Sequence, residues 1–80
     1  MNDDSIRVAV GRIAGEMSPL GERPATCADR LVEDLGYDSL AMIELSQRLE
    51  EEFALTGADT SEALDVKTVA DLLAFVERHR

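Results

Sequence analysis

The chain has 80 residues, of which 45% are hydrophobic, and its formal net charge at pH 7 is −9. A chain of this length holds one domain with one small core, and its apolar content predicts folding rather than disorder. The sequence therefore predicts a single domain over residues 1–80. Its charge excludes nucleic acid and membrane surfaces as good partners and favours basic protein surfaces.

The first residues, Met-Asn-Asp-Asp, lack the apolar stretch of a secretory signal, and no apolar run has the length of a membrane span. Cys27 is the only cysteine, which excludes an intramolecular disulfide. We expect it to act as a small apolar residue in a connecting segment. Together these features predict a cytoplasmic protein, and we expect it to be a monomer.

The first helix is predicted over residues 4–17. Asp3, Asp4 and Ser5 are candidates for its cap and first turn. Apolar residues then recur at positions i, i+4, i+7 and i+11, which is typical of one helical stripe. Ser18-Pro19 ends this pattern, because the residue before a proline avoids the helical region. The stripe consists of Ile6, Val10, Ile13 and Met17.

Residues 18–38 contain both prolines and no long periodic run, so they are predicted to form a connecting loop. A loop of this length in a small domain is more often functional than idle. Leu31, Val32 and Leu35 are predicted to form a short helical turn that pins the loop to the core.

Three further helices are predicted: residues 39–53, a short segment over 60–64, and a last helix that Thr68 caps. Asp71 lies three residues after Thr68, as a capping box requires. No strand pattern appears. The fold class is therefore predicted to be all-α, a small four-helix bundle with three main helices and one short one. The stripe of the last helix consists of Val69, Leu72, Leu73 and Val76.

The helix over residues 39–53 has two unlike faces when its residues are placed at 100° intervals. The predicted core face comprises Met42, Leu45, Ser46, Leu49 and Phe53. The opposite face comprises Leu40, Ile43, Glu44, Gln47, Glu50 and Glu51. Leu40 and Ile43 are three residues apart and would form a small apolar patch among acids, which fits docking to a basic, partly apolar groove. The alternative is that the loop or the short helix covers both side chains.

The stretch Asp-Leu-Gly-Tyr-Asp-Ser-Leu at residues 34–40 resembles the acyl carrier protein family. The resemblance continues through Glu44-Leu45 and residues 49–53, and it ends with Thr-Val-Ala-Asp-Leu at residues 68–72. In that family the serine of Gly-x-Asp-Ser-Leu carries 4′-phosphopantetheine. By resemblance, Ser39 is the attachment site, and Asp38 and Leu40 are its motif flanks.

The resemblance implies that the arm, taken from coenzyme A, ends in a thiol that holds acyl groups as thioesters. The protein would then be a carrier and not an enzyme, with no metal. Its implied partners are a phosphopantetheinyl transferase, a ketosynthase, and an acyltransferase or other acyl-processing enzymes with basic docking surfaces. The implied partner-binding residues are Leu40, Ile43, Glu44, Gln47 and Glu51.

The residues themselves are compatible with this role. A serine at a helix start lies beside unpaired backbone N–H groups, where a phosphodiester gains from the helix dipole. Gly36 allows a tight approach to the helix. A hydrolase-type serine would need a nearby base, and the only histidine, His79, lies far along the chain.

The run Leu-Gly-Tyr-Asp-Ser-Leu-Ala at residues 35–41 resembles the discrete carriers of iterative polyketide synthases more than fatty-acid carriers. Three departures from the family pattern leave partner identity open: Ala41 where an acid is common, Arg48 and Gln47 on the second helix, and the run at residues 54–58. Fatty-acid synthesis is the alternative pathway. A carrier-like interaction module that never receives the arm is the alternative class, while an EF-hand calcium site lacks the necessary ligand pattern.

Overall fold

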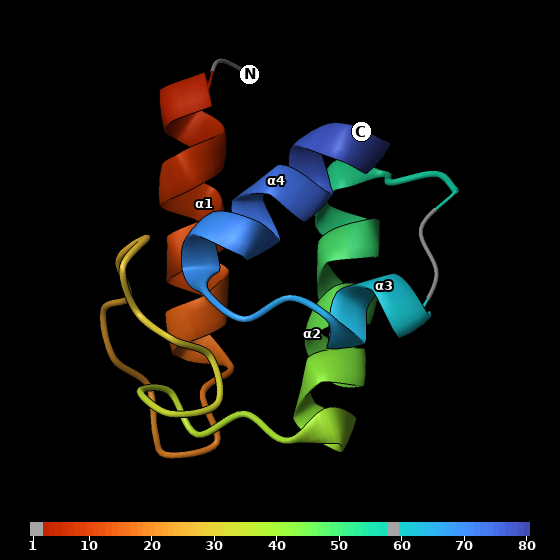
Figure 1. Ribbon diagram of the computed structural model, residues 1–80. Coiled ribbons are helices and arrows are strands. Elements are labelled where there is room, and N and C mark those ends of the chain that lie inside the picture. The colour runs from red at the N-terminus through yellow and green to blue at the C-terminus, as the bar shows by residue number, and fades with distance from the viewer. Residues whose placement is uncertain (1–2, 58–59) are drawn as a thin grey trace.

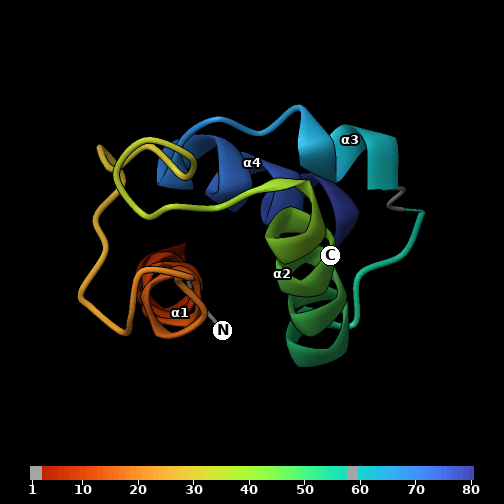
Figure 2. The ribbon, with the colours of Figure 1, turned by 90° about the horizontal axis from the view of Figure 1, so that it is seen from below.

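The computed structural model describes residues 3–57 and 60–80, and four helices lie within these ranges. The helices are α1 (Asp3–Glu16), α2 (Ser39–Phe53), α3 (Thr60–Leu64) and α4 (Val69–His79). α1 and α2 run in opposite directions, and α4 crosses between them in the view of Figure 1. From below, α1 and α2 form one layer and α3 and α4 a second (Figure 2). The predicted all-α four-helix bundle is confirmed.

The cap predicted at Thr68 is confirmed, and Asp38 caps α2. Before α2, Asp38 has an extended backbone, and its Oδ1 accepts a hydrogen bond from the Ala41 N–H at 2.8 Å. Before α4, Thr68 Oγ1 accepts from the Asp71 N–H at 3.1 Å, while Asp71 Oδ2 accepts from the Thr68 N–H at 3.2 Å. These bonds satisfy N–H groups that have no partner inside a helix. The first helix differs slightly from its prediction, since it spans Asp3–Glu16 rather than 4–17.

The core is built mainly from aliphatic side chains of all four helices, as the composition indicates. Leu73 and Phe53 belong to the predicted core-facing stripes, but they are only half-buried, because Leu73 lies at the margin of its stripe and Phe53 is the last residue of α2. Two aromatic rings, Tyr37 and Phe75, are fully buried instead. The buried apolar residues are Ile6, Val10, Ile13, Ala14, Leu31, Leu35, Tyr37, Met42, Leu45, Leu49, Ala63, Val66, Val69, Leu72, Phe75 and Val76.

The long loop between α1 and α2 is fastened to the core, but not by a helix. Leu31 and Leu35 are fully buried, whereas Val32 is 59% exposed, so its predicted place in the anchor is wrong. The segment consists of hydrogen-bonded turns, and its i,i+4 spacing turns Leu31 and Leu35 inward and Val32 outward. A short antiparallel bridge adds to this attachment: the Leu31 N–H donates to the Lys67 carbonyl at 2.9 Å, and the Val69 N–H donates to the Asp29 carbonyl at 3.0 Å.

The first part of the same loop packs closely on α1 because that helix carries glycines at positions 11 and 15. A Cβ atom at Gly15 would collide with the Arg23 carbonyl oxygen, and one at Gly11 would lie 3.0 Å from the Ala25 carbonyl oxygen. The Arg23 N–H donates to the Gly15 carbonyl at 3.2 Å. The two glycines therefore form a flat helix surface on which the backbone of residues 23–25 lies.

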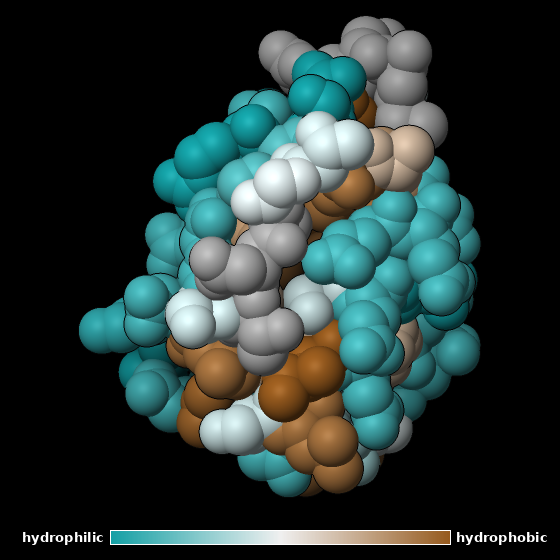
Figure 3. Space-filling model, turned by 90° about the vertical axis from the view of Figure 1, so that its right-hand side faces the viewer, coloured by the Kyte–Doolittle hydropathy of each residue, from teal (hydrophilic) through white to brown (hydrophobic). Residues whose placement is uncertain are grey.

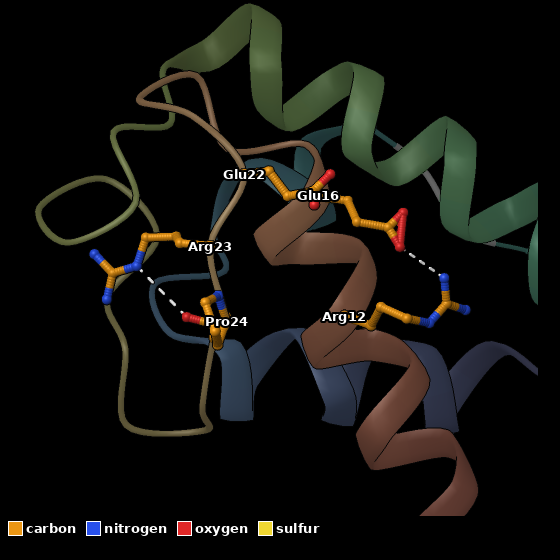
Figure 4. Close-up of a pocket in the computed structure, with 6 residues that line it drawn as sticks. Arg12, Glu16, Glu22, Arg23 and Pro24 are labelled. Carbon is orange, nitrogen blue, oxygen red and sulfur yellow. Dashed lines mark hydrogen bonds and ion pairs between the residues drawn. The ribbon is translucent and has the colours of Figure 1, made fainter.

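A hollow of about 650 Å³ lies beside this contact (Figure 4). Its charged groups largely neutralise one another, since Arg12 pairs with Glu16 at 2.7 Å. The guanidinium of Arg23 points away from that pair. None of the residues that line this hollow is among the predicted site residues.

The other end of the bundle is closed by His79. Its Nδ1 lies 3.1 Å from the Thr56 carbonyl oxygen, and its Nε2 lies 2.7 Å from Glu62 Oε2. The ring thus ties α4 to α3 and to the loop that precedes α3. None of the helices in residues 3–57 and 60–80 has the length and apolar character needed to cross a membrane.

Candidate functional site

The site predicted at Ser39 lies at the start of α2, at the lower end of the bundle in Figure 1. Ser39 is exposed, and its hydroxyl has no hydrogen-bond partner among the described residues. The Asp38 side chain accepts a hydrogen bond from the Ala41 N–H at 2.8 Å, and the Asp38 carbonyl oxygen accepts one from the Met42 N–H at 2.9 Å. The N–H groups of Ser39 and Leu40 remain without a partner in the described part of the chain. A phosphate ester on Ser39 would meet free N–H donors and the positive end of the helix dipole.

The backbone that leads to Ser39 is held by Tyr37. This side chain is 1% exposed, and its hydroxyl donates to the Ala14 carbonyl of α1 at 2.6 Å. The Tyr37 N–H donates to the Leu31 carbonyl at 2.9 Å. Sequence reasoning missed this role, although a single aromatic residue two positions before a helix start was a usable signal. The exposed Ser39 side chain therefore stands on a backbone that is fixed to the core.

We expect Tyr37→Phe to lower the free energy of unfolding by about 1–2 kcal/mol, because the buried Ala14 carbonyl loses its donor. Burial raises the pKa of Tyr37 to about 12 from an ordinary value of 10. The folded state thus favours the neutral phenol. The stability that the neutral Tyr37 side chain gives the folded state is fully present below pH 10 and is lost as the pH rises toward 12. Melting curves give the free energy of unfolding of wild type and of Tyr37→Phe at each pH. The difference between the two proteins should be smaller at pH 11 than at pH 9 by roughly 1 kcal/mol. An unchanged gap would contradict a buried, hydrogen-bonded phenol.

Gly36 makes the turn before the site possible. Its φ of +77° lies in the left-handed region, which favours glycine. A Cβ atom there would also collide with the side chain of Leu20, whose Cδ1 would be 2.9 Å away. Leu20 therefore lies directly over the segment that leads to Ser39, a contact between residues far apart in sequence that the motif does not reveal.

Charged groups further back stabilise the same loop. The backbone N–H of Arg30 donates to Asp34 Oδ2 at 2.8 Å, and its guanidinium contacts the same carboxylate. These hydrogen bonds hold the pKa of Asp34 below its ordinary value. The Ser18 hydroxyl donates to the Leu35 carbonyl at 2.6 Å, inside the protein. The motif is thus hydrogen-bonded at Asp34 to Arg30, earlier in the loop, and at Leu35 to Ser18, which follows α1.

The second helix places its two faces largely as expected. Met42, Leu45, Ser46 and Leu49 are buried on the core face. On the opposite face Leu40 is 66% exposed, and the side chains of Glu44, Gln47 and Glu51 are exposed. Ile43 is half-buried. Its side chain is therefore partly exposed, as in the predicted docking patch, and partly covered, as in the alternative.

Figure 3 views the side that carries α3, and its apolar side chains gather at the end where α2 begins. The exposed large apolar residues of α2 and α3 within the described ranges are Leu40 and Leu64. An exposed apolar surface therefore lies on the same side and end of the molecule as the start of α2.

The chain matches the family described as "Phosphopantetheine attachment site" over residues 4–76. It is 35% identical to an acyl carrier protein of Akkermansia muciniphila over 78 residues, which are 98% of this chain and 96% of that protein. It is 43% identical to an acyl carrier protein of Helicobacter hepaticus over 51 residues, 64% of this chain and 66% of that one. An acyl carrier protein of Rickettsia bellii is 39% identical over 51 residues, 64% and 62% of the two chains.

The fold and these matches define a small helical carrier with a phosphopantetheine attachment site. The chain belongs to the acyl carrier protein family. Its cofactor is covalent 4′-phosphopantetheine, which supplies a terminal thiol for holding acyl groups. Members of this family are non-catalytic carriers that interact with acyl-processing enzymes.

Proposed function

We propose that Ser39 is the residue that carries the 4′-phosphopantetheine arm and that the protein presents acyl thioesters to successive enzymes. The observation that carries this proposal is an exposed serine hydroxyl at the first residue of α2, with no hydrogen-bond partner in residues 3–57 and 60–80, within Gly-Tyr-Asp-Ser-Leu at residues 36–40. The chemistry of the site fits the group, since a free alcohol forms a phosphodiester and free N–H donors stand beside it. One core joins all four helices, which supports a single carrier domain over residues 1–80.

We also propose that the protein performs no bond chemistry of its own. A serine nucleophile of hydrolase type needs an adjacent base. Both ring nitrogens of His79 face Thr56 and Glu62, at the end of the bundle opposite the start of α2 (Figure 1). This arrangement supports a carrier in which the Ser39 oxygen is a point of attachment only.

Incubation with coenzyme A and a broad-specificity phosphopantetheinyl transferase tests the proposal. The intact mass should rise by one phosphopantetheine group per chain, and peptide mapping should locate the group on Ser39. A mass that stays unchanged would favour the alternative of a carrier-like interaction module. A group on any other residue would disprove the assignment of Ser39.

We assign the carrier to polyketide biosynthesis, where a ketosynthase and an acyltransferase are its expected partners. The support is the run at residues 35–41, which resembles discrete polyketide-synthase carriers. The relatives found are named only as acyl carrier proteins, which leaves fatty-acid synthesis as the competing pathway. Elongation of the loaded protein by polyketide ketosynthases and by fatty-acid ketosynthases, measured side by side, distinguishes the two.

The partner-binding face is proposed to be the outward face of α2, with Leu40, Ile43, Glu44, Gln47 and Glu51. Exposed charges raise association rates, and salt screens them over about 8–10 Å. We expect Glu44→Lys and Glu51→Lys each to lower the kcat/KM of the transferase, and added salt to lower that of wild type.

Glu77→Lys is the matched control, because it makes the same change in net charge on an exposed residue of α4. It should retain most of the wild-type kcat/KM at low salt. Equal losses in all three variants would show that only net charge matters. If kcat/KM changes neither with salt nor in Glu44→Lys and Glu51→Lys, the acidic face serves solubility and not docking.

A further inference from the structure

Leu20 combines an exposed side chain with a fixed position. Its side chain is 72% exposed, the largest value among the exposed large apolar residues of the described chain. The turn that carries it is closed by the Gly21 N–H, which donates to the Ser18 carbonyl at 3.0 Å. That turn is joined to the attachment loop by the 2.6 Å bond from the Ser18 hydroxyl to the Leu35 carbonyl. Leu20 is thus an apolar group held at the surface rather than one on a loose loop.

The position of Leu20 relative to Ser39 follows from its contact with Gly36. The leucine side chain occupies the space next to the Gly36 Cα atom. Consecutive Cα atoms are about 3.8 Å apart, so the Cα atoms of Gly36 and Ser39 lie within about 11 Å of each other. The segment after α1 and the start of α2 also lie at the same end of the bundle (Figure 1). Leu20 and Leu40 are therefore both exposed apolar residues close to Ser39 at this end of the bundle.

An enzyme that modifies Ser39 must cover this surface, because its active site has to reach the hydroxyl oxygen. A stable protein interface buries about 800 Å² on each partner, a disc of roughly 16 Å radius. The whole chain exposes 4608 Å², so such an interface covers roughly a sixth of it. By the chain lengths above, the side chain of Leu20 lies within about 16 Å of the Ser39 Cα atom, so a disc of this size is wide enough to reach it.

We propose that Leu20 is a contact residue for the phosphopantetheinyl transferase, which docks on a surface running from Leu40 across Ser39 to the turn at residues 18–21. The inference rests on the proposed attachment at Ser39. It extends the docking surface beyond the acidic face of α2 to a residue outside the sequence motif. Burial of an exposed leucine against the enzyme stabilises the complex, so its loss should act on binding rather than on the chemical step.

The test compares Leu20→Ser with Val8→Ser, because Val8 is 69% exposed and lies on α1. Transferase rates are measured by intact mass over a range of carrier concentrations with coenzyme A in excess. Leu20→Ser should raise the KM for the carrier about tenfold and leave kcat near the wild-type value, whereas Val8→Ser should change neither. Leu20→Met, which keeps an apolar side chain of similar volume, should restore most of the lost kcat/KM.

Three results would overturn the inference: a wild-type KM for Leu20→Ser, an equal rise in KM for Val8→Ser, or a fall in kcat with unchanged KM. The last would mean that Leu20 only positions the turn. Melting curves for each variant identify any loss that comes from unfolding, and Leu20→Met then provides the decisive comparison. Ser39→Ala is measured in parallel: addition of the arm to that variant would refute the attachment site itself. No addition to it, with normal kinetics for Leu20→Ser, would refute only the role of Leu20.

Discussion

Replacing Ser39 with alanine should abolish addition of the phosphopantetheine arm and leave the bundle folded. Alanine has no oxygen on which a phosphodiester can form. The side chain is exposed and makes no hydrogen bond within the described residues, so we expect the free energy of unfolding to change by no more than about 0.5 kcal/mol. Intact mass after the transferase reaction and a melting curve measure the two effects.

Ser61→Ala is the matched control for this result. Ser61 is also exposed and also lies in the first turn of a helix, α3, but it lacks the Gly-x-Asp flank. The variant should accept one group on Ser39 at the wild-type rate. If Ser39→Ala still gains mass, the arm is attached elsewhere, and peptide mapping of that product would identify the residue.

Gly15→Ala should destabilise the protein, although alanine is normally the better residue inside a helix. The added methyl group meets the Arg23 carbonyl oxygen, which belongs to the backbone and cannot rotate away. Overpacking of this kind costs about 1–3 kcal/mol, and more where the backbone must move, while the gain in helix propensity is about 1 kcal/mol. We expect the melting temperature to fall by on the order of 10 °C in a domain of this size.

Gly11→Ala provides the comparison on the same helix. A methyl group there lies 3.0 Å from the Ala25 carbonyl oxygen, a tight contact that a small shift relieves. Its stability should stay within about 0.5 kcal/mol of wild type because helix propensity offsets the contact. Equal melting temperatures for the Gly11 and Gly15 variants would contradict the close packing of residues 23–25 on α1.

The features that could be predicted from the sequence depend on short-range physics. The cap at Asp38 and the capping box of Thr68 and Asp71 are fixed by hydrogen bonds within three residues, so the sequence predicts both. The buried stripes of α1 and α4 follow from the helical period. The four helices, and hence the surface position of Ser39, could be predicted on these grounds.

The features that the sequence does not predict, or predicts wrongly, depend on contacts between distant segments. The inward turn of Tyr37 is set by the Ala14 carbonyl, and the place of Leu20 is set by Gly36. Val32 is predicted to be in the core because it is apolar, but burial there is decided by which side of the turn faces the core. Ile43 lies at the border between two faces of α2, where helical periodicity alone does not decide whether a side chain is buried.

Tyr37 also makes the protein its own spectroscopic reporter. The chain has one tyrosine and no tryptophan, so its aromatic absorption and emission come almost wholly from this ring. The ring is enclosed in the core two residues before Ser39, and its hydroxyl is bonded to α1. Near-ultraviolet circular dichroism or tyrosine fluorescence therefore follows the packing beneath Ser39 without any label. Once the spectrum of the partner enzyme alone is subtracted, docking that distorts this end of the bundle should change the signal, whereas docking that engages only the exposed side chains should leave it unchanged.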